Sequence, residues 1–102
     1  MASELAERAK KKAQEVAKIY GISTITPEAM KLIEDRFDKK QFEIKSLIEK
    51  SQKSDAALMR SVEIVIKTAS EEAKSRGQTY ILSADIESAV QKNFCKVYPF
   101  CG

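Results

Sequence analysis

One short pattern occurs twice in this chain. Residues 15–25 read EVAKIYGISTI and residues 71–81 read EEAKSRGQTYI, so Glu, Ala, Lys, Gly and Ile recur at the same spacing, 56 positions later (71 minus 15). In each copy an amphipathic segment ends at a glycine, a short β-branched segment follows, and a hydroxyl residue then precedes a new amphipathic segment. Such internal self-similarity constrains the fold more than any single residue does. The repeat predicts a helix–strand–helix unit that is used twice.

The first unit is predicted to cover residues 3–51. Gly21 is placed to end the first helix with a left-handed residue, and the β-branched residues in 22–25 predict a short strand. Thr26 is the expected N-cap of the next helix, and we prefer one helix over 27–51, kinked in its middle, to two shorter ones. The apolar face of the first helix is formed by Leu5, Ala9, Ala13, Val16 and Tyr20.

The second unit is predicted to cover residues 54–95. Its long helix begins at Ser54 or Asp55 and ends at Gly77; residues 79–82 form the second strand, and the last helix starts at Ser83. Two strands of about four residues do not form a stable sheet alone, so we expect them to pair as a bridge held by the helices. The expected buried positions of this unit are Leu58, Val62, Val65, Ile66, Ala69, Ala73, Ile86, Ala89, Val90 and Phe94.

Length and composition predict one all-α domain over residues 1–102, with an apolar tail at 96–102. The chain has no His, no glycine-rich phosphate loop and no cluster of metal-ligating residues, so we expect no catalysis, no metal and no cofactor. No apolar run approaches the roughly 18–20 residues of a membrane span and no signal peptide is recognisable, which predicts a cytoplasmic protein without a membrane partner.

The second copy carries a resemblance to a known family. Residues 72–89, EAKSRGQTYILSADIESA, look like the end of an archaeal or eukaryotic histone fold, in which a long helix passes through a glycine and a short strand into a last helix with an Asp-Ile pair. Residues 53–56 look like the turn that begins the long helix of that fold. The resemblance implies a histone-fold-like domain that binds DNA as a dimer.

Two further families share the pattern. Helix–strand–helix units of this kind resemble the small helical lid of AAA+ ATPases. Residues 8–30 are similar to a small C-terminal region of the light-independent protochlorophyllide reductase B subunit. These likenesses imply a non-enzymatic protein-interaction module instead of a DNA-binding protein.

Basic residues supply the candidate DNA contacts. There are 18 Lys and Arg against 15 Asp and Glu, a net charge of +3, which alone does not indicate nucleic-acid binding. Arg76 and Thr79, near the position of the histone Arg-Thr pair, are the candidates in the second unit. The most basic segment is a candidate phosphate-binding patch or, because Glu4, Glu7 and Glu15 share its face, a solvated mixed-charge surface. Its cations are Arg8, Lys10, Lys11 and Lys12.

Apolar residues outside the helical stripes supply a candidate partner interface. Ile64 lies on the side of its helix opposite the predicted core. The aromatic residues Phe94, Tyr98 and Phe100 near the C-terminus are expected either to fold back onto the chain's own helices or to dock on a second chain. Cys95 and Cys101 are expected to be buried thiols, with an intermolecular disulfide as the other interpretation.

Two functions follow from these features. The first is non-specific DNA binding through basic residues, by a small dimeric histone-fold-like protein. The second is a protein-interaction module that uses Ile64 and the aromatic tail, as a homo-oligomer or with another protein. A contiguous basic face on the folded chain would favour DNA, and a mixed face would favour the interaction module.

Overall fold

The computed structural model describes residues 4–39, 55–93 and 100, and its described part contains helices, two short strands and the turns that join them. The elements, in chain order, are α1 (Glu4–Ile19), β1 (Thr24–Ile25), α2 (Pro27–Lys39), α4 (Asp55–Ser75), β2 (Tyr80–Ile81) and α5 (Ser83–Lys92). The all-α class is therefore confirmed. The predictions for the second half of the 27–51 helix, for Phe94 and Tyr98, and for both cysteines lie outside the described residues.

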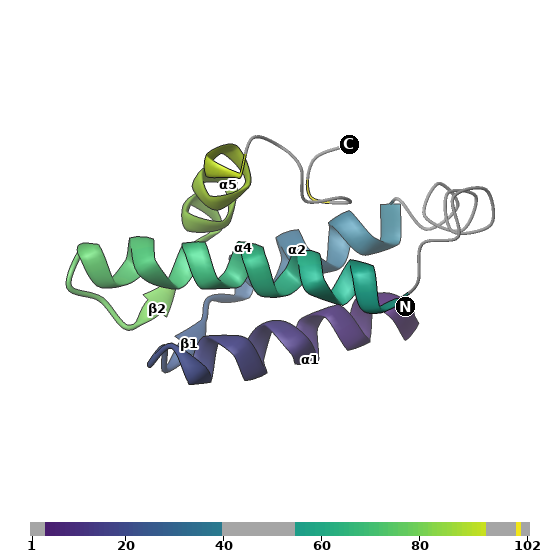
Figure 1. Ribbon diagram of the computed structural model, residues 1–102, viewed down its shortest axis with the longest axis horizontal. Helices are drawn as coiled ribbons and strands as arrows, with labels where there is room; N and C mark the ends of the chain where they lie inside the picture. Colours follow the sequence, from purple (N-terminus) through teal and green to yellow (C-terminus); the bar gives the residue numbers. More distant parts are fainter. Residues whose placement is uncertain (1–3, 40–54, 94–99, 101–102) are drawn as a thin grey trace.

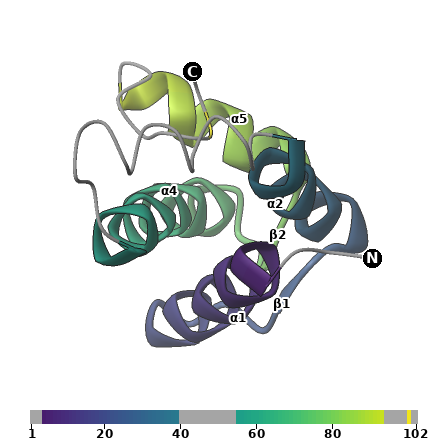
Figure 2. The ribbon, with the colours of Figure 1, turned by 90° about the vertical axis from the view of Figure 1, so that its right-hand side faces the viewer.

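The two strands pair with each other, as the sequence predicted. Their pairing is parallel, with Thr24 opposite Tyr80 and Ile25 opposite Ile81. A parallel bridge places the helices that precede the two strands on the same side, so α1 and α4 lie side by side, as Figure 1 shows. Viewed from one end, α1, α4, α5 and α2 surround a common core, each helix in contact with the next (Figure 2).

Both helices that precede a strand end in the same hydrogen-bonded turn. Gly21 has φ of 80° and Gly77 has φ of 75°, conformations that glycine adopts without steric cost. In the first copy, the N–H of Ile22 donates to the carbonyl of Ala17 at 2.9 Å; in the second, the N–H of Gln78 donates to that of Ala73 at 3.0 Å. These are Schellman turns, which satisfy carbonyls that a helix end leaves unpaired.

Three of the five repeated residue types, Ala, Gly and Ile, therefore have structural roles. Ala17 and Ala73 are buried and accept the bond that closes each turn, while Ile25 and Ile81 are opposite each other in the bridge and belong to the core. Hydrogen bonds across the bridge reinforce it, since the carbonyl of Ile81 accepts both the N–H of Thr26 at 3.1 Å and its hydroxyl at 2.9 Å. The repeated Ala, Gly and Ile need no ligand to account for them.

The core agrees with the predicted helical stripes wherever the structure describes them. All six predicted positions of α4 are buried, and so are the three described predicted positions of α5. On α1 the buried face is rich in alanine, which lets the neighbouring helices approach closely. It consists of Ala6, Ala9, Ala13, Val16 and Ala17, with Tyr20 partly buried against it.

Phe100 belongs to this core. Its side chain is 3% exposed and its ring meets that of Phe37 edge to face, with centroids 5.7 Å apart and planes at 80°. This is a favourable geometry for two aromatic rings. Phe100 thus agrees with the first interpretation of the tail, in which it folds back onto the chain's own helices. Because it is buried there, it has little area to offer a partner.

Candidate functional site

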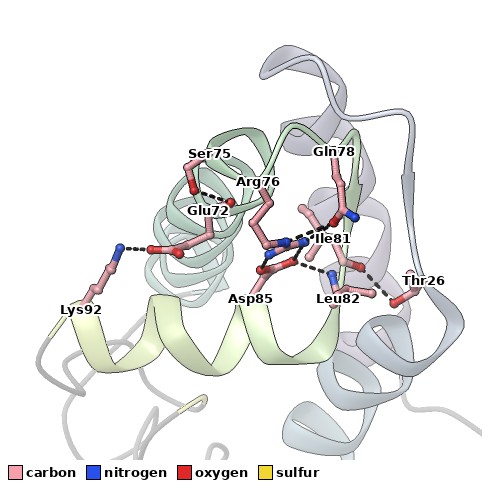
Figure 3. A network of polar contacts seen from close by, with 9 residues as sticks. All are labelled: Thr26, Glu72, Ser75, Arg76, Gln78, Ile81, Leu82, Asp85 and Lys92. Atoms are coloured by element: carbon pink, nitrogen blue, oxygen red, sulfur yellow. Dashed lines mark hydrogen bonds and ion pairs between the residues drawn. The ribbon is translucent and has the colours of Figure 1, made fainter.

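Arg76, the predicted DNA contact of the second unit, is bound within the chain. It follows α4, and its guanidinium donates to both carboxylate oxygens of Asp85 on α5, from Nη2 at 3.0 Å and from Nη1 (Figure 3). Its Nε and Nη2 also donate to Oε1 of Gln78, at 3.0 and 2.8 Å. The Asp85 carboxylate raises the pKa of Arg76 above its ordinary value, chiefly through the hydrogen bond.

Asp85 explains why this ion pair forms. Its side chain is 4% exposed, so its charge needs a partner, and the two-pronged guanidinium supplies one. Oδ2 also accepts the backbone N–H of Leu82 at 2.8 Å, which stabilises the first turn of α5. The N-cap is thus Leu82, and α5 begins at Ser83, as the sequence predicted; the acidic side chain three residues after the cap accepts the backbone N–H of the cap residue.

Thr79, the other DNA candidate of the second unit, lies directly before β2. Its carbonyl accepts the N–H and the hydroxyl of Ser23, at 2.8 and 3.0 Å, and its own hydroxyl accepts the hydroxyl of Ser23 at 3.1 Å. These contacts join the two copies of the repeat. Arg76 and Thr79 are near each other in the chain, but the hydrogen bonds of both serve the packing of the domain.

The lysines of α1 are partly neutralised by acidic neighbours. Lys10 contacts Glu7 at 2.9 Å and Glu34 of α2 at 2.7 Å; these hydrogen bonds, that of Glu34 first, raise the pKa of its ammonium group. Lys12 contacts Glu63 of α4 at 3.1 Å. Lys10 and Lys12 therefore join α1 to α2 and to α4.

The remaining candidates do not complete a basic patch around Arg76. Arg8 and Lys11 are exposed on α1. The predicted α1 cations, residues 8–12, lie within the first nine residues of that 16-residue helix, whereas Arg76 lies in the four residues between α4 and β2. Lys10 is nine residues from the end of α1 at Ile19, about 14 Å along the helix axis. The structure does not bring the two predicted groups of DNA contacts together.

A groove between α1 and α4 instead contains one exposed apolar residue, Ile19, with two partly buried ones, Tyr20 and Ile64. Its volume is about 400 Å³, and Ile64, the predicted interface residue, lies in it. Ile19 is 77% exposed here and is the one exposed large apolar residue in the described part of the chain. The apolar lining comprises Val16, Ile19, Tyr20 and Ile64.

Charged residues of α4 border this groove in a regular order. Arg60 precedes Ile64 by four residues, and Lys67 and Glu71 follow it by three and seven, so these four residues form one stripe along the helix. Glu63 lies beside the stripe, where it contacts Arg60 and Lys12, both at 3.1 Å. The hydrogen bond from Lys12, then that from Arg60, lowers the pKa of the Glu63 carboxyl. Within the described ranges, neither Lys67 nor Glu71 has an ionic partner.

Other kinds of site are not found in the part of the chain that the structure describes. No three His, Cys, Asp or Glu side chains of residues 4–39 and 55–93 are grouped to hold a metal ion. Among these residues, no helix has the length and apolar character to cross a bilayer. Comparison with protein-family models, curated proteins and solved structures found no match to this chain.

Sequence reasoning found Ile64 but missed Ile19 and Tyr20 as parts of the same surface. Ile19 lies outside the predicted apolar stripe of its helix, and this position was the signal in the sequence that could have indicated an exposed apolar residue. The parallel bridge places α1 beside α4, so Ile19 of one helix and Ile64 of the other line the same groove. Asp85 was also missed as the partner of Arg76, because nine residues and a strand separate them.

Proposed function

We propose that this chain is a histone-fold-like, non-enzymatic protein-interaction module that binds a helix of another polypeptide chain in the groove between α1 and α4. The observation that carries the proposal is the exposed Ile19, which lines the same groove as Ile64. Apolar residues between two helices, bordered by charges, are the surface on which an amphipathic helix docks.

The charges support a helix as the ligand. The rim contains both signs, Arg60 and Lys67 with Glu63 and Glu71, so neither a polyanion nor a polycation matches it throughout. A helix with an apolar centre and mixed charges at its edges matches both the apolar and the charged parts of the groove.

DNA binding stays the competing prediction, and the ion pairs weigh against it. A cation releases counterions from DNA only if it is available to a phosphate. Lys10, Lys12 and Arg76 would each have to leave a carboxylate to contact DNA. If DNA is nevertheless the ligand, its affinity should fall steeply with salt, and neutralising Lys10, Lys11 and Lys12 should flatten that dependence.

Site-specific photo-crosslinking in the cell tests the proposal. A photoreactive amino acid is placed at Ile19, and in a matched control at Glu87, an exposed residue of α5 that does not line the groove. We expect a discrete protein adduct from position 19, absent from position 87 and lost when Ile64→Asp is added. Equal adducts from both positions, or salt-dependent DNA binding unaffected by Ile64→Asp, would contradict it.

A further inference from the structure

The charge order along α4 identifies a partner for the groove. Arg60, Glu63, Lys67 and Glu71 carry charges in the order plus, minus, plus, minus, and all four border the groove. Read in the opposite direction, the same residues give minus, plus, minus, plus. We propose that the groove binds the α4 helix of a second copy of this chain, antiparallel to its own. This inference rests on the proposed function and specifies its partner.

An antiparallel pair makes every one of these charges meet its opposite. With the two-fold axis between residues 65 and 66, Arg60 faces Glu71 of the second copy, and Glu71 faces its Arg60. Glu63 lies one residue from the position opposite Lys67 of the second copy, and Lys67 lies one residue from the position opposite its Glu63. This offset is about 1.5 Å of helix rise. Lys67 and Glu71, which have no ionic partner within the described part of the chain, both gain one.

The apolar residues agree with the same arrangement. Ile64 lies about 1.5 residues from that axis, so the two copies of Ile64 meet near the centre of the interface, where burial contributes most to affinity. Val16, Ile19 and Tyr20 lie beside the C-terminal half of the α4 stripe, since the Lys12–Glu63 contact and the Gly21–Lys74 proximity show that α1 and α4 run in the same direction. In the antiparallel pair, Ile19 is then near Arg60 of the second copy, whose aliphatic stem can cover it.

A parallel pair fails the same comparison. Every stripe residue would face its own equivalent, so Arg60 would meet Arg60 and Glu71 would meet Glu71. Like charges that face each other across an interface disfavour that arrangement. An isologous, antiparallel dimer is thus the self-association that this surface selects.

Charge reversal tests the inference, with the dissociation constant measured by sedimentation equilibrium on the full chain. Arg60→Glu alone and Glu71→Lys alone each convert two symmetry-related attractive contacts into repulsive ones. We expect each to weaken the dimer at least about tenfold, equivalent to about 1.4 kcal/mol. The double variant R60E/E71K exchanges the charges and should restore the wild-type constant. A parallel dimer would not be restored, because like charges would still face each other.

Two controls keep the outcomes separate. Glu87→Lys makes the same change at an exposed glutamate outside the groove and should leave the dimer intact, and circular dichroism should show unchanged helix content in every variant. A dimer that ignores both single reversals uses another surface and overturns the inference. A wild-type chain that stays monomeric also overturns the inference. If the photoreactive residue at position 19 then crosslinks to a different protein, the proposed function still holds. If no such crosslink forms, both the inference and the proposed function are contradicted.

Discussion

Replacing Phe100 by alanine tests whether the end of the chain belongs to the core of the domain. Phe100 is 3% exposed and contacts Phe37, which is fully buried on α2. Truncating a core phenylalanine to alanine typically lowers the free energy of unfolding by about 3–5 kcal/mol. Phe100 lies near the C-terminus, however, where the freed segment regains conformational entropy that offsets part of the loss. We therefore expect a loss of about 2–3 kcal/mol.

Urea denaturation followed by circular dichroism measures this loss. A domain of this size is expected to have a total stability of roughly 5–15 kcal/mol and an m-value near 1 kcal/mol per molar urea, so the midpoint should fall by about 2–3 M. Sedimentation should show no change in oligomeric state, because Phe100 lies in the core and not in the α1–α4 groove.

Phe100→Leu is the matched control. Leucine keeps most of the buried apolar area but loses the edge-to-face contact with Phe37, so a loss of about 0.5–1.5 kcal/mol is expected. An unchanged midpoint in Phe100→Ala would refute the reasoning, since it would mean that Phe100 is not packed in the core. A dimer that dissociates while the midpoint stays constant would favour docking of the tail on a second chain.

Three further predictions concern the bridge and the ion pairs. Gly77→Ala should lower the free energy of unfolding by about 1–2 kcal/mol in urea titrations, because its φ of 75° is left-handed although nothing lies within 4 Å of the added Cβ; an equal or higher midpoint would contradict the turn. Asp85→Asn should lower the melting temperature, since the single oxygen of the buried amide cannot accept from both Nη groups of Arg76 and from the N–H of Leu82. An unchanged melting temperature would mean that these hydrogen bonds do not stabilise α5. Glu63→Gln should be less stable than wild type at neutral pH but not in acid. The lowered pKa of Glu63 contributes stability that is present above its unfolded pKa and is lost as pH falls through the folded one; a constant difference across pH would exclude this cause.

The sequence predicted the elements of this fold because their signals are local. Glycine at a helix end, Thr26 as N-cap and the apolar stripe of α4 each depend on a few neighbouring residues, and the structure confirms all three: Gly21 and Gly77 are left-handed, the hydroxyl of Thr26 accepts the N–H of Ala29 at 3.3 Å, and the stripe is buried. Pairing of the strands was inferred correctly because neither is stable alone. The parallel direction was not inferred, since it depends on how the two units pack.

The candidate site was harder to predict for the same reason. Whether a cation is available for DNA depends on its spatial neighbours, and the contacts of Lys10 with Glu34 and of Lys12 with Glu63 span 24 and 51 residues (34 minus 10 and 63 minus 12). A helical wheel of α1 shows only the acids on α1 itself. The groove likewise requires α1 and α4 to be adjacent. Ile64 was recognised from its own helix, while the role of Ile19 depended on the other one.

The central claim is that the α1–α4 groove is a protein-contact surface occupied by a second copy of the chain. Amide chemical shifts measured during dilution test this claim most directly. Heteronuclear NMR spectra of the full chain are compared over about a hundredfold range of concentration, which spans roughly 2.7 kcal/mol of association free energy. We predict concentration-dependent shifts at residues 16–20 and 60–71, with α2 and the first turn of α5 unchanged. Shifts confined to α2 and α5, or none in the groove at any concentration, would contradict the account.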